Sequence, residues 1–125
     1  MAQIVLIVDD ESMTRDLLRL MLRPAGYEIC EAEDGVDALE KIEQHRPDVV
    51  LLDVMMPRLD GLSTCQRLRT QQETQNLPVI MFSANTSFSA IEEGMAAGAS
   101  RYLTKPVARR VLIDTIQEFL GKPGT

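Results

Sequence analysis

The stretch Val49-Val50-Leu51-Leu52-Asp53 decides the fold of this chain. Four aliphatic residues in a row, bounded by turn signals, are typical of a strand that is buried on both faces, as in a parallel sheet. The run ends in a carboxylate, and Pro57 follows shortly after it. We therefore expect Asp53 at the C-terminal end of a central strand, where open α/β sheets form their ligand crevice. A second apolar run, residues 4–8, ends in the same way at Asp9-Asp10.

Outward from these two runs, strand and helix patterns alternate along the chain. Strand patterns cover residues 3–8, 27–32, 49–53, 79–82 and 101–104, and a helical pattern follows each of them. Five strands that alternate with five helices predict a doubly wound α/β domain. Apolar residues at helical spacing include Met13, Leu17, Leu20 and Met21 in the first helix, Val36, Leu39 and Ile42 on the inner face of the second, and Val111, Leu112 and Ile116 in the last.

The apolar content of the strands predicts their order in the sheet. The first, third and fourth strands are wholly apolar and belong in the centre, whereas residues 27–32 alternate and residues 101–104 are short and polar, as edge strands are. Because crossovers are right-handed, the order 2-1-3-4-5 satisfies these demands, with helices on both faces of a parallel (βα)5 sheet of flavodoxin-like type. Its switch point lies between strands one and three, directly under Asp9, Asp10 and Asp53.

Length, charge and cysteine content indicate what kind of protein this is. A chain of 125 residues corresponds to one domain, for which we expect residues 1–121, with residues 122–125 as a tail or the start of a linker. The net charge of −6 argues against nucleic acid as a direct ligand. The absence of a membrane span or signal peptide predicts a cytoplasmic protein. Cys30 and Cys65 are isolated, as expected of buried small hydrophobic residues in a reducing compartment.

Five polar residues follow the strand ends: Asp9, Asp10, Asp53, Ser83 and Lys105. Three close carboxylates repel one another unless a hard cation or raised pKa values relieve them. Mg²⁺ takes oxygen ligands and is typically held by one or two carboxylates together with a phosphate. A carboxylate can also attack phosphorus and form an acyl phosphate, and a lysine and a hydroxyl could then neutralise the phosphoryl oxygens.

Other interpretations of these residues are open at this point. Asp9, Asp10 and Ser83 could be helix-capping residues, although their joint placement with Lys105 at one rim favours a site. A phosphatase with an aspartate nucleophile would usually carry a second Asp two residues after the nucleophile, where this chain has Met55. A flavodoxin-like mononucleotide binder would need a phosphate-cradling loop after the first strand, and the chain has no GxxxxGK[ST] or GxGxxG motif.

Together, Asp9-Asp10, residues 53–61 (DVMMPRLDG), Ser83-Ala84 and Lys105-Pro106 resemble the receiver domain of two-component response regulators, the CheY-like family, over essentially the whole chain. The resemblance implies phosphotransfer to Asp53 from a sensor histidine kinase or a histidine phosphotransfer protein. Such a protein is not a conventional enzyme, but it catalyses its own phosphorylation, also from small phosphodonors, and its own dephosphorylation.

The resemblance also implies the ligands of a metal ion. Mg²⁺, with Mn²⁺ as a substitute, would be held by the carboxylates of Asp10 and Asp53 and the backbone carbonyl of Met55, while Asp9 acts through water. Lys105 would pair with the phosphoryl group. The Lys105–Pro106 peptide bond is expected to be cis.

A switch is implied as well. Ser83 would move to hydrogen-bond the phosphoryl group, and Tyr102 would turn inward as it does so. The changed surface would consist of the fourth helix, which contains Gly94, the fifth strand and the fifth helix. The output partner stays open, as does a phosphorylation-dependent homodimer. The chain is interpreted either as a stand-alone regulator or as a part of a longer protein.

Overall fold

The structure is a computed structural model that describes residues 2–121, so the expected tail at residues 122–125 lies outside the described residues. Its strands are β1 (Ile4–Val8), β2 (Glu28–Ala32), β3 (Val49–Asp53), β4 (Val79–Ser83) and β5 (Arg101–Thr104). Its helices are α1 (Ser12–Leu22), α2 (Gly35–His45), α3 (Gly61–Arg69), α4 (Phe88–Ala96) and α5 (Arg109–Leu120).

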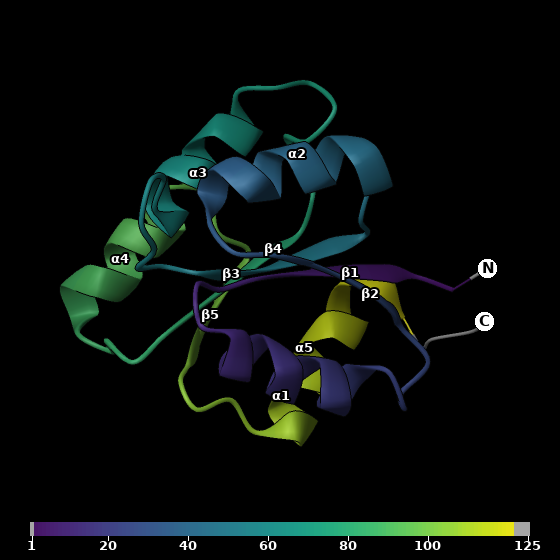
Figure 1. Ribbon diagram of the computed structural model, residues 1–125. Coiled ribbons are helices and arrows are strands. Elements are labelled where there is room, and N and C mark those ends of the chain that lie inside the picture. The colour runs from purple at the N-terminus through teal and green to yellow at the C-terminus, as the bar shows by residue number, and fades with distance from the viewer. Residues whose placement is uncertain (1, 122–125) are drawn as a thin grey trace.

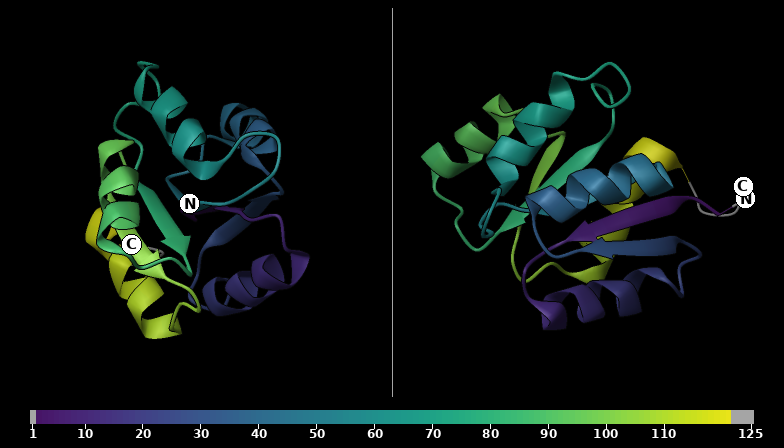
Figure 2. Two further views of the ribbon diagram at one scale, coloured as in Figure 1. Left: turned by 90° about the vertical axis from the view of Figure 1, so that its left-hand side faces the viewer. Right: turned by 45° about the horizontal axis from the view of Figure 1, so that its top comes forward.

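The five strands form one parallel sheet in the order β2-β1-β3-β4-β5, which confirms the predicted topology. Helices α1 and α5 cover one face of the sheet, and α2, α3 and α4 cover the other (Figures 1 and 2). The register pairs Val8 of β1 with Leu52 of β3. The residues that follow these two positions, Asp9 and Asp53, therefore leave adjacent strands at the same edge.

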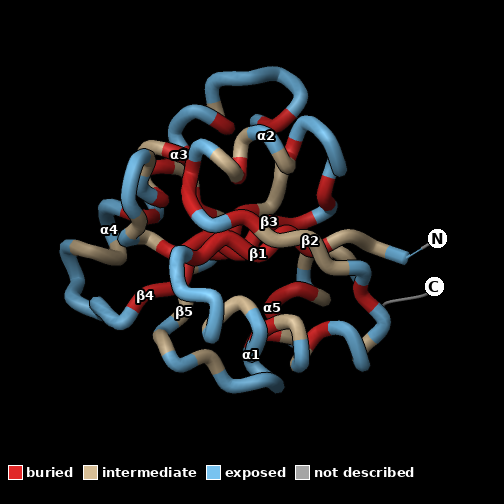
Figure 3. Tube along the Cα trace, viewed as in Figure 1, coloured by how far each residue is buried: buried red, intermediate tan, exposed pale blue. Residues whose placement is uncertain are grey.

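The core consists of two layers, one on each face of the sheet, and the central strands contribute to both. All residues of β3 and β4 are buried, as are four of the five in β1 (Figure 3). In contrast, β2 and β5 are only partly covered, as expected of edge strands. Continuous aliphatic runs are stable in a sheet that is covered on both faces, so burial of these side chains fixes the central strands.

Aspartate side chains cap the first turns of α2 and α3. The Asp34 carboxylate accepts a hydrogen bond from Asp37 N at 2.9 Å and caps α2, and the Asp60 carboxylate does the same for α3 with Ser63 N at 2.8 Å. Both helices therefore begin directly after an aspartate that precedes a glycine. A carboxylate at this position satisfies a free backbone N–H and interacts favourably with the helix dipole.

The side of each helix that faces the core was harder to predict. In α1, Met13, Leu17 and Leu20 are 81%, 50% and 69% exposed, whereas Leu18 and Leu22 are buried. The α1 sequence carries apolar residues around most of its circumference, so helical spacing alone fits two faces. Val36 and Val111, which were expected to face inward, are also exposed in part. None of the described helices combines the length and apolar character needed to cross a membrane.

Candidate functional site

The ends of β1 and β3 bring three carboxylates together. One carboxylate oxygen of each of Asp9, Asp10 and Asp53 lies within 4.8 Å of the others. Asp9 and Asp53 are buried, and Asp10 is exposed at the entrance. The predicted convergence is therefore present, and it follows from the parallel register of two adjacent strands.

Lys105 lies against this acidic cluster. Its Nζ is 2.9 Å from Asp9 Oδ2 and 3.3 Å from Asp53 Oδ1, and it lies 5.0 Å from the centroid of the Phe82 ring. Its backbone N–H donates to Ser83 O at 2.9 Å, so the ends of β4 and β5 are joined at the same edge. The Lys105–Pro106 peptide bond is cis, as predicted.

The electrostatics of the cluster favour a further cation. Burial, followed by the neighbouring Asp9 carboxylate, raises the pKa of Asp53 to about 6, although Lys105 acts in the opposite direction. Burial tends to lower the pKa of Lys105, but the carboxylates of Asp9 and Asp53 outweigh burial and raise it. One ammonium group therefore does not offset the burial and the repulsion by Asp9 that oppose ionisation of Asp53.

The cluster fits a hard divalent cation such as Mg²⁺. It offers several carboxylate oxygens, and Asp10 is open to solvent for ligand exchange. The two oxygens of Asp9 are differently engaged: Oδ1 accepts a hydrogen bond from Glu11 N at 2.8 Å, and buried Oδ2 faces Lys105 without hydrogen-bond geometry. Asp10 and Asp53 therefore have the freer carboxylates for direct coordination.

Ser83 and Tyr102 lie on the side of the site that faces α4. Ser83 is buried, and its Oγ accepts a hydrogen bond from Asn85 N at 3.1 Å. The Tyr102 hydroxyl donates to Asn85 O at 2.7 Å. Both side chains also line a cavity of about 370 Å³ that extends to Met56 and Glu93. Sequence reasoning missed Asn85, which carries no charge and follows no apolar run.

Sequence reasoning also missed two arginines around the cluster. Arg15 Nη1 donates to Asp9 O at 2.6 Å, and Arg58 Nε donates to the Asp34 carboxylate at 2.6 Å. Arg58 lies inside the stretch of residues 53–61 that carries the family resemblance, and this position was the one sequence signal that it belongs to the site. Its partner is 24 residues away in the chain, and no local pattern links the two.

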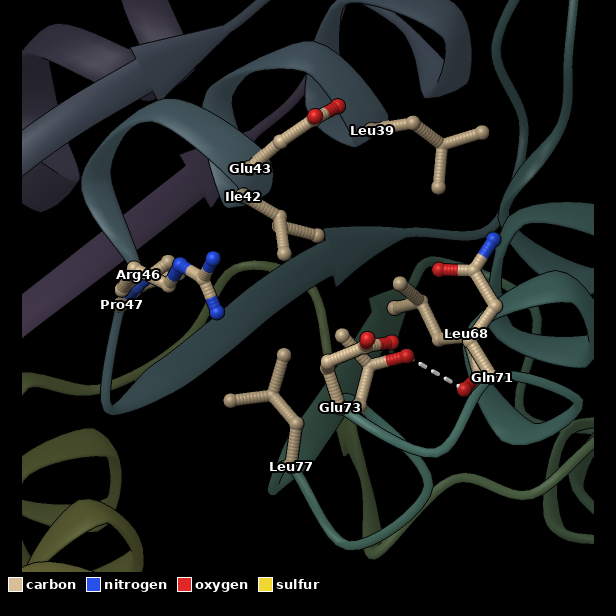
Figure 4. Close-up of a pocket in the computed structure, with 10 residues that line it drawn as sticks. Leu39, Ile42, Glu43, Arg46, Pro47, Leu68, Gln71, Glu73 and Leu77 are labelled. Atoms are coloured by element: carbon tan, nitrogen blue, oxygen red, sulfur yellow. Dashed lines mark hydrogen bonds between the residues drawn. The ribbon is translucent and has the colours of Figure 1, made fainter.

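A second cavity of about 370 Å³ lies between the C-terminal parts of α2 and α3 and the segment that leads to β4 (Figure 4). Leu39, Ile42, Leu68 and Leu77 contribute apolar walls, and the charged side chains at its rim are exposed. The buried Thr74 hydroxyl that lines it already donates to Leu68 O. Among the described residues, this cavity therefore has no buried polar group left to bind a ligand, unlike the acidic cluster.

An open parallel sheet with three carboxylates, a lysine and a hydroxyl at its C-terminal edge defines a phosphoacceptor class of signalling domain. Residues 5–117 match the family described as Response regulator receiver domain. This chain belongs to that family, whose CheY-like domains accept phosphoryl groups in two-component systems, interact with histidine kinases and output domains, and bind Mg²⁺ at the acidic site. The phosphatase and the nucleotide-binder interpretations receive no support from these comparisons.

Relatives and solved structures agree with this assignment. The chain is 44% identical over 118 residues to "Response regulator MprA" of Mycobacterium sp. (strain KMS), covering 94% of this chain and 50% of that protein. It thus spans about half the length of the curated relatives that it matches.

A putative response regulator from Chloroflexus aurantiacus J-10-fl superposes with a TM-score of 0.92 at 37% identity, covering 98% of this chain and 100% of that one. A second solved structure is the receiver domain of sensor histidine kinase PA1611 from Pseudomonas aeruginosa PAO1, which has a magnesium ion coordinated in its active site cleft. It superposes with a TM-score of 0.89 at 32% identity, covering 98% of this chain and 100% of that one.

Proposed function

We propose that Asp53 accepts the phosphoryl group from a phosphohistidine of a sensor histidine kinase or a histidine phosphotransfer protein. The single observation that carries this assignment is the division of roles within the cluster. Asp9 is fully buried and engaged by Lys105 and Glu11 N, and Asp10 is exposed beside the strand end. Asp53 ends the central strand and contacts Lys105 at 3.3 Å through one oxygen. It is therefore the carboxylate best suited to attack.

The proposed reaction exchanges one bond for another. A carboxylate oxygen of Asp53 attacks phosphorus, the P–N bond of the phosphohistidine breaks, and the leaving imidazole takes up a proton. When bound through Asp10, Asp53 and the Met55 carbonyl, with Asp9 acting through water, Mg²⁺ supplies positive charge for the phosphoryl oxygens. Lys105 stabilises the same oxygens from the other side. Water later attacks phosphorus, the acyl O–P bond breaks, and inorganic phosphate leaves as the free carboxylate is restored.

The exposed face of α1 supports docking of a phosphodonor protein. Met13, Leu17 and Leu20 follow one another at helical spacing and are largely exposed. α1 begins two residues after Asp10, so this apolar stripe adjoins the entrance to the site. A contiguous exposed apolar surface next to a reactive group is typical of a protein contact.

A switch through Ser83 and Tyr102 is the second part of the proposal. The cavity that both residues line offers space for the Tyr102 ring. Ser83 would move toward the phosphoryl group, Tyr102 would turn inward, and the surface formed by α4, β5 and α5 would change for an output partner or a second copy of the chain. The proposal also includes a cytoplasmic location, supported by the free thiols of Cys30 and Cys65, and Mn²⁺ as a substitute for Mg²⁺.

Labelling by acetyl phosphate tests the assignment. The protein should acquire an acid-labile phosphoryl group in the presence of Mg²⁺ or Mn²⁺, without nucleotide or flavin. Asp53→Asn should abolish this label because the amide cannot act as the nucleophile. Asp48→Asn, an exposed carboxylate at the opposite end of β3, is the matched control and should label normally. Undiminished labelling of Asp53→Asn would exclude Asp53 as the acceptor.

A further inference from the structure

An ion pair binds the loop after Asp53 to the start of α2. Arg58 has a left-handed backbone conformation with a φ of 63°, and its Nε donates to Asp34 Oδ2 at 2.6 Å. The Asp34 side chain is 5% exposed, and its other oxygen caps α2. Beside this pair, Gly35 N donates to Leu59 O at 3.0 Å. Residues 54–60 are therefore attached to α2 at two adjacent points.

A second arginine binds the turn after β1 in a similar way. Arg15 Nη1 donates to Asp9 O at 2.6 Å, and its Nε lies 3.3 Å from Glu31 Oε1. The other oxygen of Glu31 accepts a hydrogen bond from Arg19 Nη1 at 2.7 Å. The turn that carries Asp9 and Asp10 is thus attached to the end of β2.

Both anchoring carboxylates belong to β2 and its connection to α2. β2 is the edge strand beside β1 and contributes no carboxylate to the acidic cluster. Nevertheless, Glu31 binds Arg15 of α1, which also donates to the turn that carries Asp9, and Asp34 binds Arg58 of the loop after Asp53. Arg58 reaches Asp34 although β3, the strand that precedes its loop, is separated from β2 by β1.

We propose that Arg15 and Arg58 are positioning residues of the cation site, which hold its two ligand-bearing segments against the β2–α2 connection. The inference rests on the proposed function, in which Asp10, Asp53 and the Met55 carbonyl hold Mg²⁺. Mg²⁺ requires near-ideal octahedral geometry, so its affinity depends strongly on where the ligands lie before it binds. A loop that is already ordered loses less conformational entropy on binding than a free one.

The same contacts should matter less for global stability. The Arg58 side chain is 56% exposed, and the buried Asp34 carboxylate keeps its hydrogen bond from Asp37 N when the guanidinium group is removed, so the loss in the free energy of unfolding should be small. A purely structural role would change the melting temperature and the Mg²⁺ affinity together. A positioning role should instead weaken Mg²⁺ binding while it leaves the melting temperature nearly unchanged.

Isothermal titration with Mg²⁺ alone, together with thermal unfolding of the metal-free protein, tests the inference. Arg58→Asn keeps a residue that tolerates left-handed backbone but removes the guanidinium group. We expect roughly tenfold weaker Mg²⁺ binding for Arg58→Asn and for Arg15→Gln, the lower end of the loss typical of outer-shell partners. Arg58→Lys should recover part of the affinity, because it retains the positive charge.

A double-mutant comparison isolates the pair. Asp34→Asn keeps an oxygen for the α2 cap but loses its charge, so it should weaken Mg²⁺ binding as Arg58→Asn does, and combining the two should add no further loss. Arg101→Gln, which breaks the exposed pair with Glu118 at 3.0 Å, is the matched control and should bind Mg²⁺ normally.

Two outcomes are distinguishable. If Asp10→Asn weakens Mg²⁺ binding but Arg15→Gln and Arg58→Asn do not, the positioning inference is overturned and the proposed function stands. If Asp10→Asn binds Mg²⁺ as the parent does, the cation site itself is wrong. Amide exchange of residues 54–60 in the metal-free protein gives an independent measurement. Arg58→Asn should accelerate this exchange, and unchanged protection would contradict the positioning role of the Arg58–Asp34 pair.

Discussion

At Asp53, burial and the neighbouring Asp9 carboxylate both oppose ionisation, and together they outweigh Lys105. A pKa raised from 3.8 to about 6 corresponds to about 3 kcal/mol of unfavourable free energy in the ionised form. Because the folded protein then binds more protons than the unfolded chain, the metal-free protein should lose stability as the pH rises from about 4 to about 6. Removing the charge by Asp53→Asn should prevent this loss.

Urea unfolding in EDTA at several pH values measures the effect. Asp53→Asn should be more stable than the metal-free parent at pH 7 by up to about 3 kcal/mol, and the two should converge near pH 4. Saturating Mg²⁺ should reduce or reverse the difference, because it stabilises only the parent. Equal stabilities at pH 7 would mean that the ionised Asp53 is compensated by other groups.

Asp10 and Lys105 should separate cation binding from phosphorylation. Asp10→Asn removes a charge and a ligand from the proposed first coordination shell, so Mg²⁺ affinity should fall by tenfold or more. Lys105→Ala removes a positive charge from the cluster, so Mg²⁺ should still bind, whereas labelling by acetyl phosphate should slow. Calorimetry and labelling check the two effects, and loss of Mg²⁺ binding in Lys105→Ala would contradict this division.

At the scale of single elements, the sequence predicted strands better than helix faces. The runs that end at Val8 and Asp53 admit one interpretation, since a side chain on either face of a central strand is covered. In α1, both Leu17 and Leu18 fit a helical stripe, and packing on the sheet selects Leu18. Which of the two leucines faces the sheet depends on residues that are distant in the chain, so the spacing of apolar residues within the helix cannot predict it.

In α4, Gly94 has a steric role that its helix propensity does not reveal. A Cβ at this position would lie 2.9 Å from Tyr102 Cδ2 and 3.1 Å from Met81 Sδ. Gly94→Ala should therefore move the Tyr102 ring and weaken its hydrogen bond to Asn85, while the gain in helix propensity of about 0.8–1.0 kcal/mol offsets part of the strain.

Tyr102 ring resonances and thermal unfolding check this prediction. The resonances should shift in Gly94→Ala, with a net loss in stability of no more than about 2 kcal/mol. Ser89→Ala, on the exposed side of the same helix, is the matched control that raises helix propensity without touching the ring. Identical Tyr102 resonances in the parent and in Gly94→Ala would show that the helix yields instead of the ring.

For the whole molecule, the strand order followed from which runs are apolar, and the acidic site followed from the strand order. The contacts that surround the site did not. The Arg58–Asp34 pair joins two connecting segments 24 positions apart, and the Tyr102–Asn85 hydrogen bond joins β5 to the loop before α4, 17 positions away. Such pairs depend on the path of the loops in the folded protein. The spacing of apolar residues that predicts strands and helices carries no information on them.

The same long-range contacts predict how phosphorylation would reach the α4 side of the molecule. Asn85 accepts from the Tyr102 hydroxyl through its carbonyl and donates to Ser83 Oγ through its N–H. If Ser83 turns toward a phosphoryl group on Asp53, the bond to Asn85 N is lost, and the segment that accepts the Tyr102 hydroxyl loses its attachment to Ser83. Tyr102 can then enter the neighbouring cavity.

Amide exchange with and without beryllofluoride, a phosphoryl mimic, tests this path in the parent and in Asp53→Asn. Exchange should change at residues 85–87, where the contact to Ser83 is lost, along α4, which packs on the Tyr102 ring, and along β5, which carries Tyr102. The start of α2 is attached to the site by Arg58 and should become no less protected. Asp53→Asn should show none of these changes, since it cannot hold the mimic. Changes confined to the loops around Asp53 that never reach residues 86–104 would contradict the switch, whereas Mg²⁺ binding and labelling of Asp53 would be unaffected by that result.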